Sequence, residues 1–145
     1  MKANSALSPL QRAIGTWIVT GSHPALPGRL LHGRVTFELI EGGAFVRMHS
    51  KMEDAEVPEG VALFGTDSDD GTCTMLYFDE RSVARRYDVT FGDDGVTWSR
   101  DAPQFAQRFR VSIATDGRTM EGSGTMKKEA AEWESDLQLS YVRAT

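Results

Sequence analysis

Closely spaced turn signals are the feature that most restricts how this chain of 145 residues can fold. After Trp17, turn-forming pairs and triplets recur at intervals that are mostly about 8–15 residues long. These signals are Gly42-Gly43, Pro58-Glu59-Gly60, Asp70-Gly71, Asp94-Gly95, Ala102-Pro103 and Asp116-Gly117. Short runs rich in Val, Thr, Phe, Tyr and Ile lie between them. Such spacing is typical of antiparallel sandwiches and barrels.

Alternation within these runs predicts which side chains face inward. In Phe105–Ile113, every second residue is mostly apolar and the intervening residues are mostly polar. The same period of two places Tyr87, Val89 and Phe91 on an inner face together with Arg85. Near the C-terminus it predicts an outer face that includes Asp136 and an inner face formed by Trp133, Ser135, Leu137, Leu139 and Tyr141.

The number of short strands, roughly ten, favours closure because a closed sheet has no exposed edges. We therefore predict an all-β fold, a closed antiparallel up-and-down barrel that forms a single domain over residues 1–145. A barrel of more than about eight strands is too wide for its own side chains to fill. The sequence thus predicts a cavity that can hold a small molecule.

One short helix is predicted ahead of the strands, from Ser8 to Ile14. Ser8 suits the N-cap, Pro9 suits the first helical position, and Gly15 suits the left-handed stop. We expect this helix to cover one end of the barrel and residues 1–7 to form a flexible tail.

Charge and cysteine content exclude several classes of function. The net charge is −5 and the isoelectric point about 5.2, which argues against general affinity for nucleic acid or an anionic membrane. A single cysteine, Cys73, excludes an internal disulfide, and its strand context predicts a structural residue in or near the core. With no signal-peptide pattern and no apolar run long enough to span a bilayer, we expect a cytoplasmic protein.

The candidate metal ligands lack the spacing that metal sites need. His23, His32 and His49 form no H-x-H or HExxH pattern, so we expect no metal site. The acidic run Asp67–Gly71 begins like a calcium loop but lacks the later ligands, and we interpret it as a hairpin turn.

The two ends of the chain carry a family resemblance. A short helix is followed by Gly15-Thr16-Trp17, which opens the first strand of a β-meander, and the last strand LQLSYVR contains Arg143. This combination resembles the calycin superfamily of lipocalins, fatty-acid-binding proteins and nitrobindin-like proteins, and within it small bacterial lipocalin-like proteins of unassigned function. The resemblance implies that Arg143 packs across the indole of Trp17, where a cation gains energy from the ring face.

The nitrobindin branch of the superfamily implies haem, held by a histidine near the start of the last strand. In this sequence Asp136 stands where that ligand is expected, and no histidine follows His49. Since haem iron needs a proximal donor, we expect no haem and no other cofactor.

The segment Tyr77–Val89 is the main candidate for a binding site. One interpretation is a surface hairpin in which Arg85 pairs with a carboxylate. The other is that Arg85 and Tyr87 project into the cavity while Arg86 and Asp88 face water. The candidate ligand-binding residues on the second interpretation are Tyr77, Arg85, Tyr87, Gln107 and Tyr141.

An inward arginine in an apolar cavity needs an anionic partner, and a ligand carboxylate or phosphate would supply it. Tyrosine hydroxyls would add hydrogen bonds. The resemblance to fatty-acid-binding proteins implies an arginine–tyrosine clamp of this kind. Arg143 with Tyr141 is an alternative clamp, because the two residues share a strand face.

Three functions remain open. The first is a binding protein for a small apolar or amphipathic molecule, with an anionic amphiphile as one alternative. The second is a cavity enzyme of the isomerase or cyclase type that uses Tyr77, Tyr87 or Arg85, and the sequence offers no evident general base for it. The third is an interaction role, such as a homodimer through an exposed strand face, for which Met48 and Met52 suit either a contact or a cavity lining. Binding is favoured.

Overall fold

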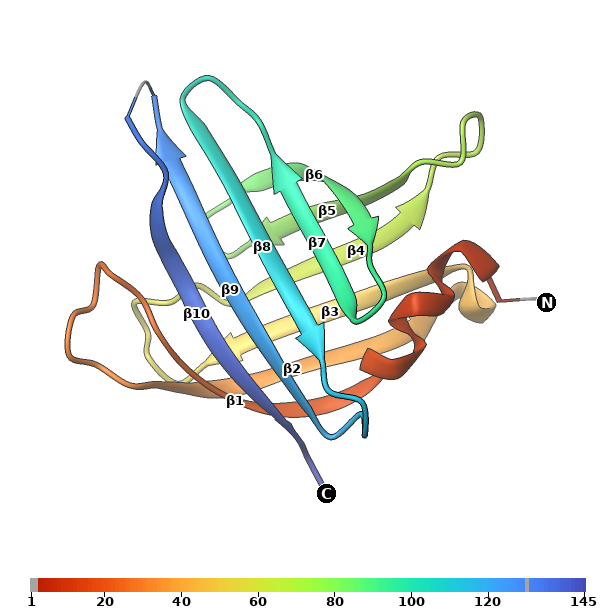
Figure 1. Ribbon diagram of the computed structural model, residues 1–145, viewed down its shortest axis with the longest axis horizontal. Helices are drawn as coiled ribbons and strands as arrows, with labels where there is room; N and C mark the ends of the chain where they lie inside the picture. Colours follow the sequence, from red (N-terminus) through yellow and green to blue (C-terminus); the bar gives the residue numbers. More distant parts are fainter. Residues whose placement is uncertain (1–2, 130) are drawn as a thin grey trace.

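Ten strands close into one barrel in the computed structural model, which describes residues 3–129 and 131–145 (Figure 1). The strands are β1 Gly15–Ser22, β2 Leu31–Ile40, β3 Phe45–Met52, β4 Gly60–Thr66, β5 Cys73–Asp79, β6 Ala84–Phe91, β7 Gly95–Arg100, β8 Phe105–Ile113, β9 Thr119–Lys128 and β10 Glu134–Arg143. Each strand pairs with the next in sequence, and β1 pairs with β10 in antiparallel fashion to close the ring. The predicted up-and-down barrel of about ten strands is confirmed.

A short helical segment, η1 (Ser5–Ala13), lies across one end of the barrel (Figure 1). It is a 3₁₀ helix that begins three residues before the predicted start, and its N-cap is Asn4 rather than Ser8. Its buried residues are Leu7, Leu10 and Ala13, a spacing of three that matches the three residues per turn of a 3₁₀ helix. Of the expected tail, residues 1–2 lie outside the described part, and Leu7 is buried.

Aromatic side chains fill part of the barrel interior. Trp98 stacks on Phe109 with ring centroids 5.1 Å apart, and Phe64 meets Trp98 edge to face at 5.7 Å. Trp17 and Tyr141 pack edge to face at 6.4 Å. Because these rings occupy the space inside the strands, the open cavity expected from strand number alone is reduced.

The contact expected between Trp17 and Arg143 is confirmed. The guanidinium lies 4.2 Å from the centre of the indole ring, and Trp17 is fully buried. Arg143 donates to the carbonyls of Arg12, Ile14 and Gly117, which ties β10 to the end of η1. Gly15 is required here because its φ is +129° and an added Cβ would lie 2.6 Å from Arg143 Nη1.

The predicted inward face of β6 is also confirmed. Tyr87 and Val89 are buried and Arg85 is half-buried, whereas Arg86 and Asp88 are exposed. The five residues follow strict alternation, so each side chain lies on the side of the sheet that the sequence indicates.

The prediction for the start of β10 is wrong. Its pairing with β9 shifts register between Ser135 and Gln138, and this irregularity turns Asp136 into the barrel, where it is 4% exposed. Trp133 lies on the outer surface instead, with the Arg108 guanidinium 4.1 Å from its ring centre. An extra residue in one strand reverses the alternation on one side of it, which explains both errors.

Candidate ligand site at the mouth of the barrel

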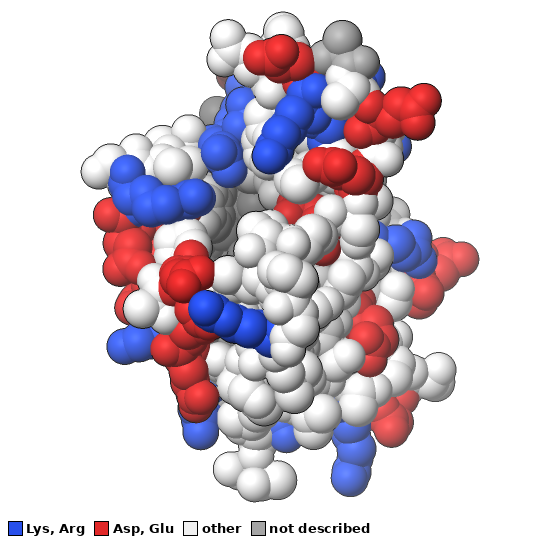
Figure 2. Space-filling view, turned by 90° about the vertical axis from the view of Figure 1, so that its left-hand side faces the viewer, with Lys and Arg blue, Asp and Glu red and all other residues white. Residues whose placement is uncertain are grey.

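The barrel end opposite η1 carries the polar inward side chains. Figure 2 faces this end and shows a recess, with Lys and Arg side chains beside it. Two further hollows, of about 500 and 520 Å³, lie on the outer wall, and Arg85, Tyr87 and Gln107 line neither of them. The candidate site is therefore defined by the side chains that converge inside the mouth.

Arg85 reaches the mouth from the start of strand β6. Its guanidinium carbon lies 4.9 Å from the centre of the Phe105 ring, and within the described residues no carboxylate lies within ion-pair distance of it. Arg100 shares the inner face of β7 and pairs in register with Gln107. The interpretation of Arg85 as half of a surface ion pair is thus not supported. Two cations face the mouth.

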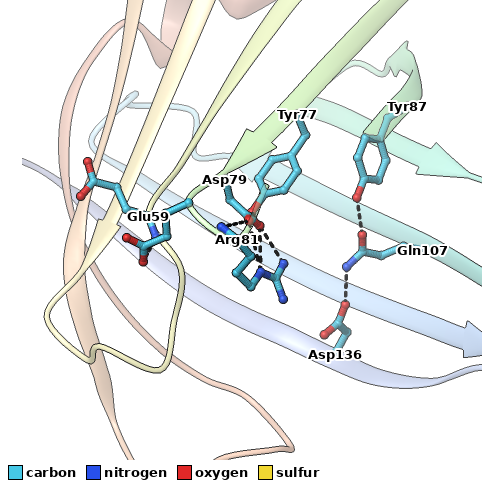
Figure 3. Close-up of polar contacts among 8 residues, drawn as sticks. Glu59, Tyr77, Asp79, Arg81, Tyr87, Gln107 and Asp136 are labelled. Atoms are coloured by element: carbon cyan, nitrogen blue, oxygen red, sulfur yellow. Dashed lines mark hydrogen bonds and ion pairs between the residues drawn. The ribbon is translucent and has the colours of Figure 1, made fainter. Parts of the chain in front are cut away.

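The ion pair of this hairpin involves Arg81 and Asp79 instead. Asp79 lies at the end of β5 with a fully buried carboxylate, and it accepts from Arg81 at 2.7 Å and from the Tyr77 hydroxyl at 2.7 Å (Figure 3). The bonds from Arg81 and Tyr77 hold the pKa of Asp79 well below its ordinary range. Burial and the bond to Asp79 raise the pKa of Tyr77. These contacts fix the hairpin and the ring of Tyr77.

A second chain of hydrogen bonds crosses the mouth between strands (Figure 3). The Tyr87 hydroxyl donates to Gln107 Oε1 at 2.5 Å, and Gln107 Nε2 donates to Asp136 Oδ2 at 2.7 Å. The other oxygen of Asp136 lies 2.9 Å from Nε2 of His23, in the connection between β1 and β2. The Ala25 N–H donates to Nδ1 of His23, so Nε2 carries the ring proton. The chain satisfies a buried carboxylate.

The structure brings four of the five predicted ligand-binding residues to the mouth. Tyr77 and Arg85 pair in register, and Tyr87 and Gln107 are hydrogen-bonded. Tyr141 lies elsewhere: it is 2% exposed and packs against Trp17 in the core. The alternative clamp of Arg143 with Tyr141 is not supported, because the Arg143 guanidinium donates to the backbone carbonyls of Gly117, Ile14 and Arg12.

Sequence reasoning missed Asp136, His23 and Arg100. Alternation could have identified Arg100, because it follows the buried Val96 and Trp98 at steps of two. Asp136 was hidden by the register shift, and His23 lies in a connection whose path no periodic pattern predicts.

The side chains at the mouth also bear on whether the protein could hold a metal ion or haem. Among the described residues no group of three His, Cys, Asp or Glu side chains could hold a metal ion. Asp136 occupies the position where the resemblance implies a haem-binding histidine, but its Oδ2 accepts from Gln107, its Oδ1 lies 2.9 Å from His23 Nε2, and Nδ1 of His23 accepts from the Ala25 N–H. This donor set does not fit a haem iron. Cys73 is half-buried, and burial raises its pKa to about 11.

Comparisons with known proteins support the fold. No family model matches the sequence, and no curated protein matches it. Rv2717c from M. tuberculosis superposes with a TM-score of 0.71 at 13% identity, covering 99% of this chain and 100% of its own. The S-type phycobiliprotein lyase CpeS from Guillardia theta gives a TM-score of 0.59 at 12% identity, covering 98% and 94%. The chain has the calycin-like ten-strand barrel fold. No helix in the described part is both long and apolar enough to cross a membrane.

Proposed function

We propose that this protein binds a small amphipathic anion in the mouth of its barrel. The observation that carries the proposal is the inward Arg85, which lies over an aromatic ring and has no carboxylate partner among the described residues. A ligand carboxylate or phosphate would supply that partner, and the Phe105 ring would contact the apolar part of the ligand. The calycin-like barrel supports small-molecule binding in general. The cytoplasmic location expected from the sequence remains a prediction.

Binding is favoured over catalysis because the tyrosine hydroxyls at the mouth already donate to other groups of the protein. A cavity enzyme needs a group that can take or give a proton to substrate. Tyr77 and Tyr87 donate their protons to protein acceptors, while Nδ1 of His23 accepts from the Ala25 N–H and its Nε2 lies 2.9 Å from the Asp136 carboxylate. These contacts leave Arg85 as an electrostatic anchor without a partner base in the same cluster.

Arg85→Ala and Arg86→Ala provide a matched test, because the two residues are neighbours on opposite faces of β6. We expect Arg85→Ala to weaken the binding of a fluorescent fatty acid or aromatic acid by roughly 1.5–3 kcal/mol, the scale of a charged hydrogen bond. Arg86→Ala should change the affinity for the acid only slightly, because salt screens the charge of an exposed side chain. Titrations of both variants measure the difference. Equal affinities in the two variants, or no binding by the wild type, would contradict the proposed function.

A further inference from the structure

In the chain of hydrogen bonds from Tyr87 through Gln107 to Asp136, each bond has a fixed donor and a fixed acceptor. Oδ2 of Asp136 accepts from Gln107 Nε2, its Oδ1 lies 2.9 Å from Nε2 of His23, and a carboxylate can only accept. Gln107 must therefore turn its amide nitrogen toward Asp136 and its oxygen toward Tyr87. The Tyr87 hydroxyl has only one proton, and it donates that proton to Gln107.

Tyr77 is fixed in the same way by an independent contact. Its hydroxyl donates to Asp79, whose oxygens also accept from Arg81. Neither phenol proton is left for a ligand. The sequence-based expectation that tyrosine hydroxyls donate to a bound anion therefore does not describe this mouth, where each phenol oxygen offers only its lone pairs.

We propose that Asp136, acting through Gln107, makes Tyr87 an acceptor and so selects an amphipathic acid that carries a hydroxyl or N–H donor beside its anionic group. This inference rests on the proposed function, since Arg85 is taken to hold the anionic group. Arg85 and Tyr87 lie two residues apart on one strand face, about 7 Å along the strand. A single small headgroup can span both.

The surroundings of Tyr87 support this geometry. Burial is the main reason that its pKa is raised, and the rise is opposed by the charge of Arg85, by a hydrogen bond from Arg85 and by the charge of Arg100. Both cations thus lie near the phenol oxygen. A ligand whose anion meets these cations brings the atoms next to that anion close to the lone pairs of Tyr87. Asp136 itself is a positioning residue, because it acts on the ligand through the side chains between them.

Asp136→Asn should reverse the direction of the chain without changing its shape. The new amide can donate to Gln107 Oε1 while its oxygen stays beside Nε2 of His23. Gln107 would then turn its nitrogen toward Tyr87, and the phenol proton would become free to donate to a ligand. Asp88→Asn is the matched control, because it makes the same change of charge at an exposed position on the outer face of β6.

The probes are hexadecanoic acid, 2-hydroxyhexadecanoic acid and 2-methoxyhexadecanoic acid, titrated by calorimetry. The methoxy compound has the extra oxygen but no proton to donate. We expect the wild type and Asp88→Asn to prefer the hydroxy acid over the other two by about two- to tenfold, the range of one hydrogen bond. Asp136→Asn should lose or reverse this preference. Tyr87→Phe should also lose it while keeping its affinity for hexadecanoic acid.

Thermal unfolding of each variant shows whether it is folded, and Tyr87→Phe carries the test if Asp136→Asn fails to fold. The inference is overturned if the folded wild type binds all three acids equally, or if Asp136→Asn keeps the wild-type preference. It is also overturned if Tyr87→Phe weakens all three acids equally, because the phenol would then be a donor to the anion. Failure of the wild type to bind any of the acids would overturn the proposed function, and this inference with it.

Discussion

Trp17 illustrates how one side chain can hold several parts of this barrel together. Its indole is fully buried, its Nε1 donates to the Ala13 carbonyl, and its face lies under Arg143. Buried aromatic residues of this size contribute through area, packing and the satisfied N–H group together. Trp133 differs in that it is 37% exposed on the outer surface.

We expect Trp17→Ala to lower the free energy of unfolding by roughly 3–5 kcal/mol, as a large core truncation does. Trp133→Ala is the matched control and should cost less than about 1 kcal/mol, because the residue is partly exposed. Urea unfolding of both variants measures the difference. Similar losses in the two variants would show that Trp17 does not anchor the closed end.

Asp79 predicts a specific dependence of stability on pH. Its pKa is lowered from the ordinary value of 3.8 by the bonds from Arg81 and Tyr77. A carboxylate with a lowered folded-state pKa contributes stability above its unfolded pKa, and this contribution is lost as the pH falls from there toward the folded-state value. The loss should therefore occur on acidification below about pH 4.

Chemical unfolding of the wild type and Asp79→Asn between pH 6 and pH 2 tests this expectation. The variant should be less stable near neutral pH, and the difference should shrink as the pH falls. Asp93→Asn, at an exposed turn position, serves as the control and should follow the wild type. A difference that stays constant over the whole range would contradict the role assigned to the Asp79 carboxylate.

At the scale of elements, regular strands were predictable and irregular ones were not. The alternation along β6 gave the correct side for each residue from Arg85 to Val89, because an unbroken strand has a period of two. The start of β10 broke that rule, since its register shift turned Asp136 inward. A single sequence shows no signal for such a shift, because Asp136 alternates with the polar Glu134 and Gln138 and so fits the outer face.

The start of η1 shows a different limit on what the sequence can predict. The sequence indicated a short helix with Pro9 near its start, and the structure places Pro9 inside a 3₁₀ helix that begins at Ser5. Asn4 caps this helix and also bonds to the Thr66 hydroxyl and the Ala44 carbonyl. These partners lie far away in sequence, so the true start depends on tertiary contacts that a local capping pattern does not contain.

At the scale of the whole molecule, the outer wall has an apolar face. Phe45, Leu76 and Phe78 are 40–42% exposed, and a hollow of about 520 Å³ lies among Phe45, Leu63 and Leu76. Glu38, Arg47, Leu63, Leu76 and Arg86 form one row across five neighbouring strands. A homodimer through an exposed strand face is one of the roles that the sequence leaves open, and we propose that it would form here. Rotation about an axis along β4 places the Arg86 of one copy opposite the Glu38 of the other, which already pairs with Arg47 of its own chain at 2.6 Å.

Leu76→Glu tests this surface, and Val142→Glu on the outer face of β10 is the matched control, since Val142 is also an exposed apolar residue. We expect sedimentation velocity to show a dimer for the wild type and for Val142→Glu. Leu76→Glu should sediment as a monomer, because a charge buried without a partner is costly. A wild type that stays monomeric at high micromolar concentration would contradict the prediction.

The seam between β1 and β10 affects the order in which the molecule can be made on the ribosome. Nine of the ten neighbouring strand pairs join consecutive segments, so most hairpins can form soon after their residues emerge. The seam instead joins positions far apart in the sequence, such as Trp17 with Arg143 and Ser22 with Gln138. Until β10 leaves the exit tunnel, β1 and β9 present unpaired edges and the indole of Trp17 lacks its cover. Nascent chains that stop before β10 should thus be the ones that chaperones retain.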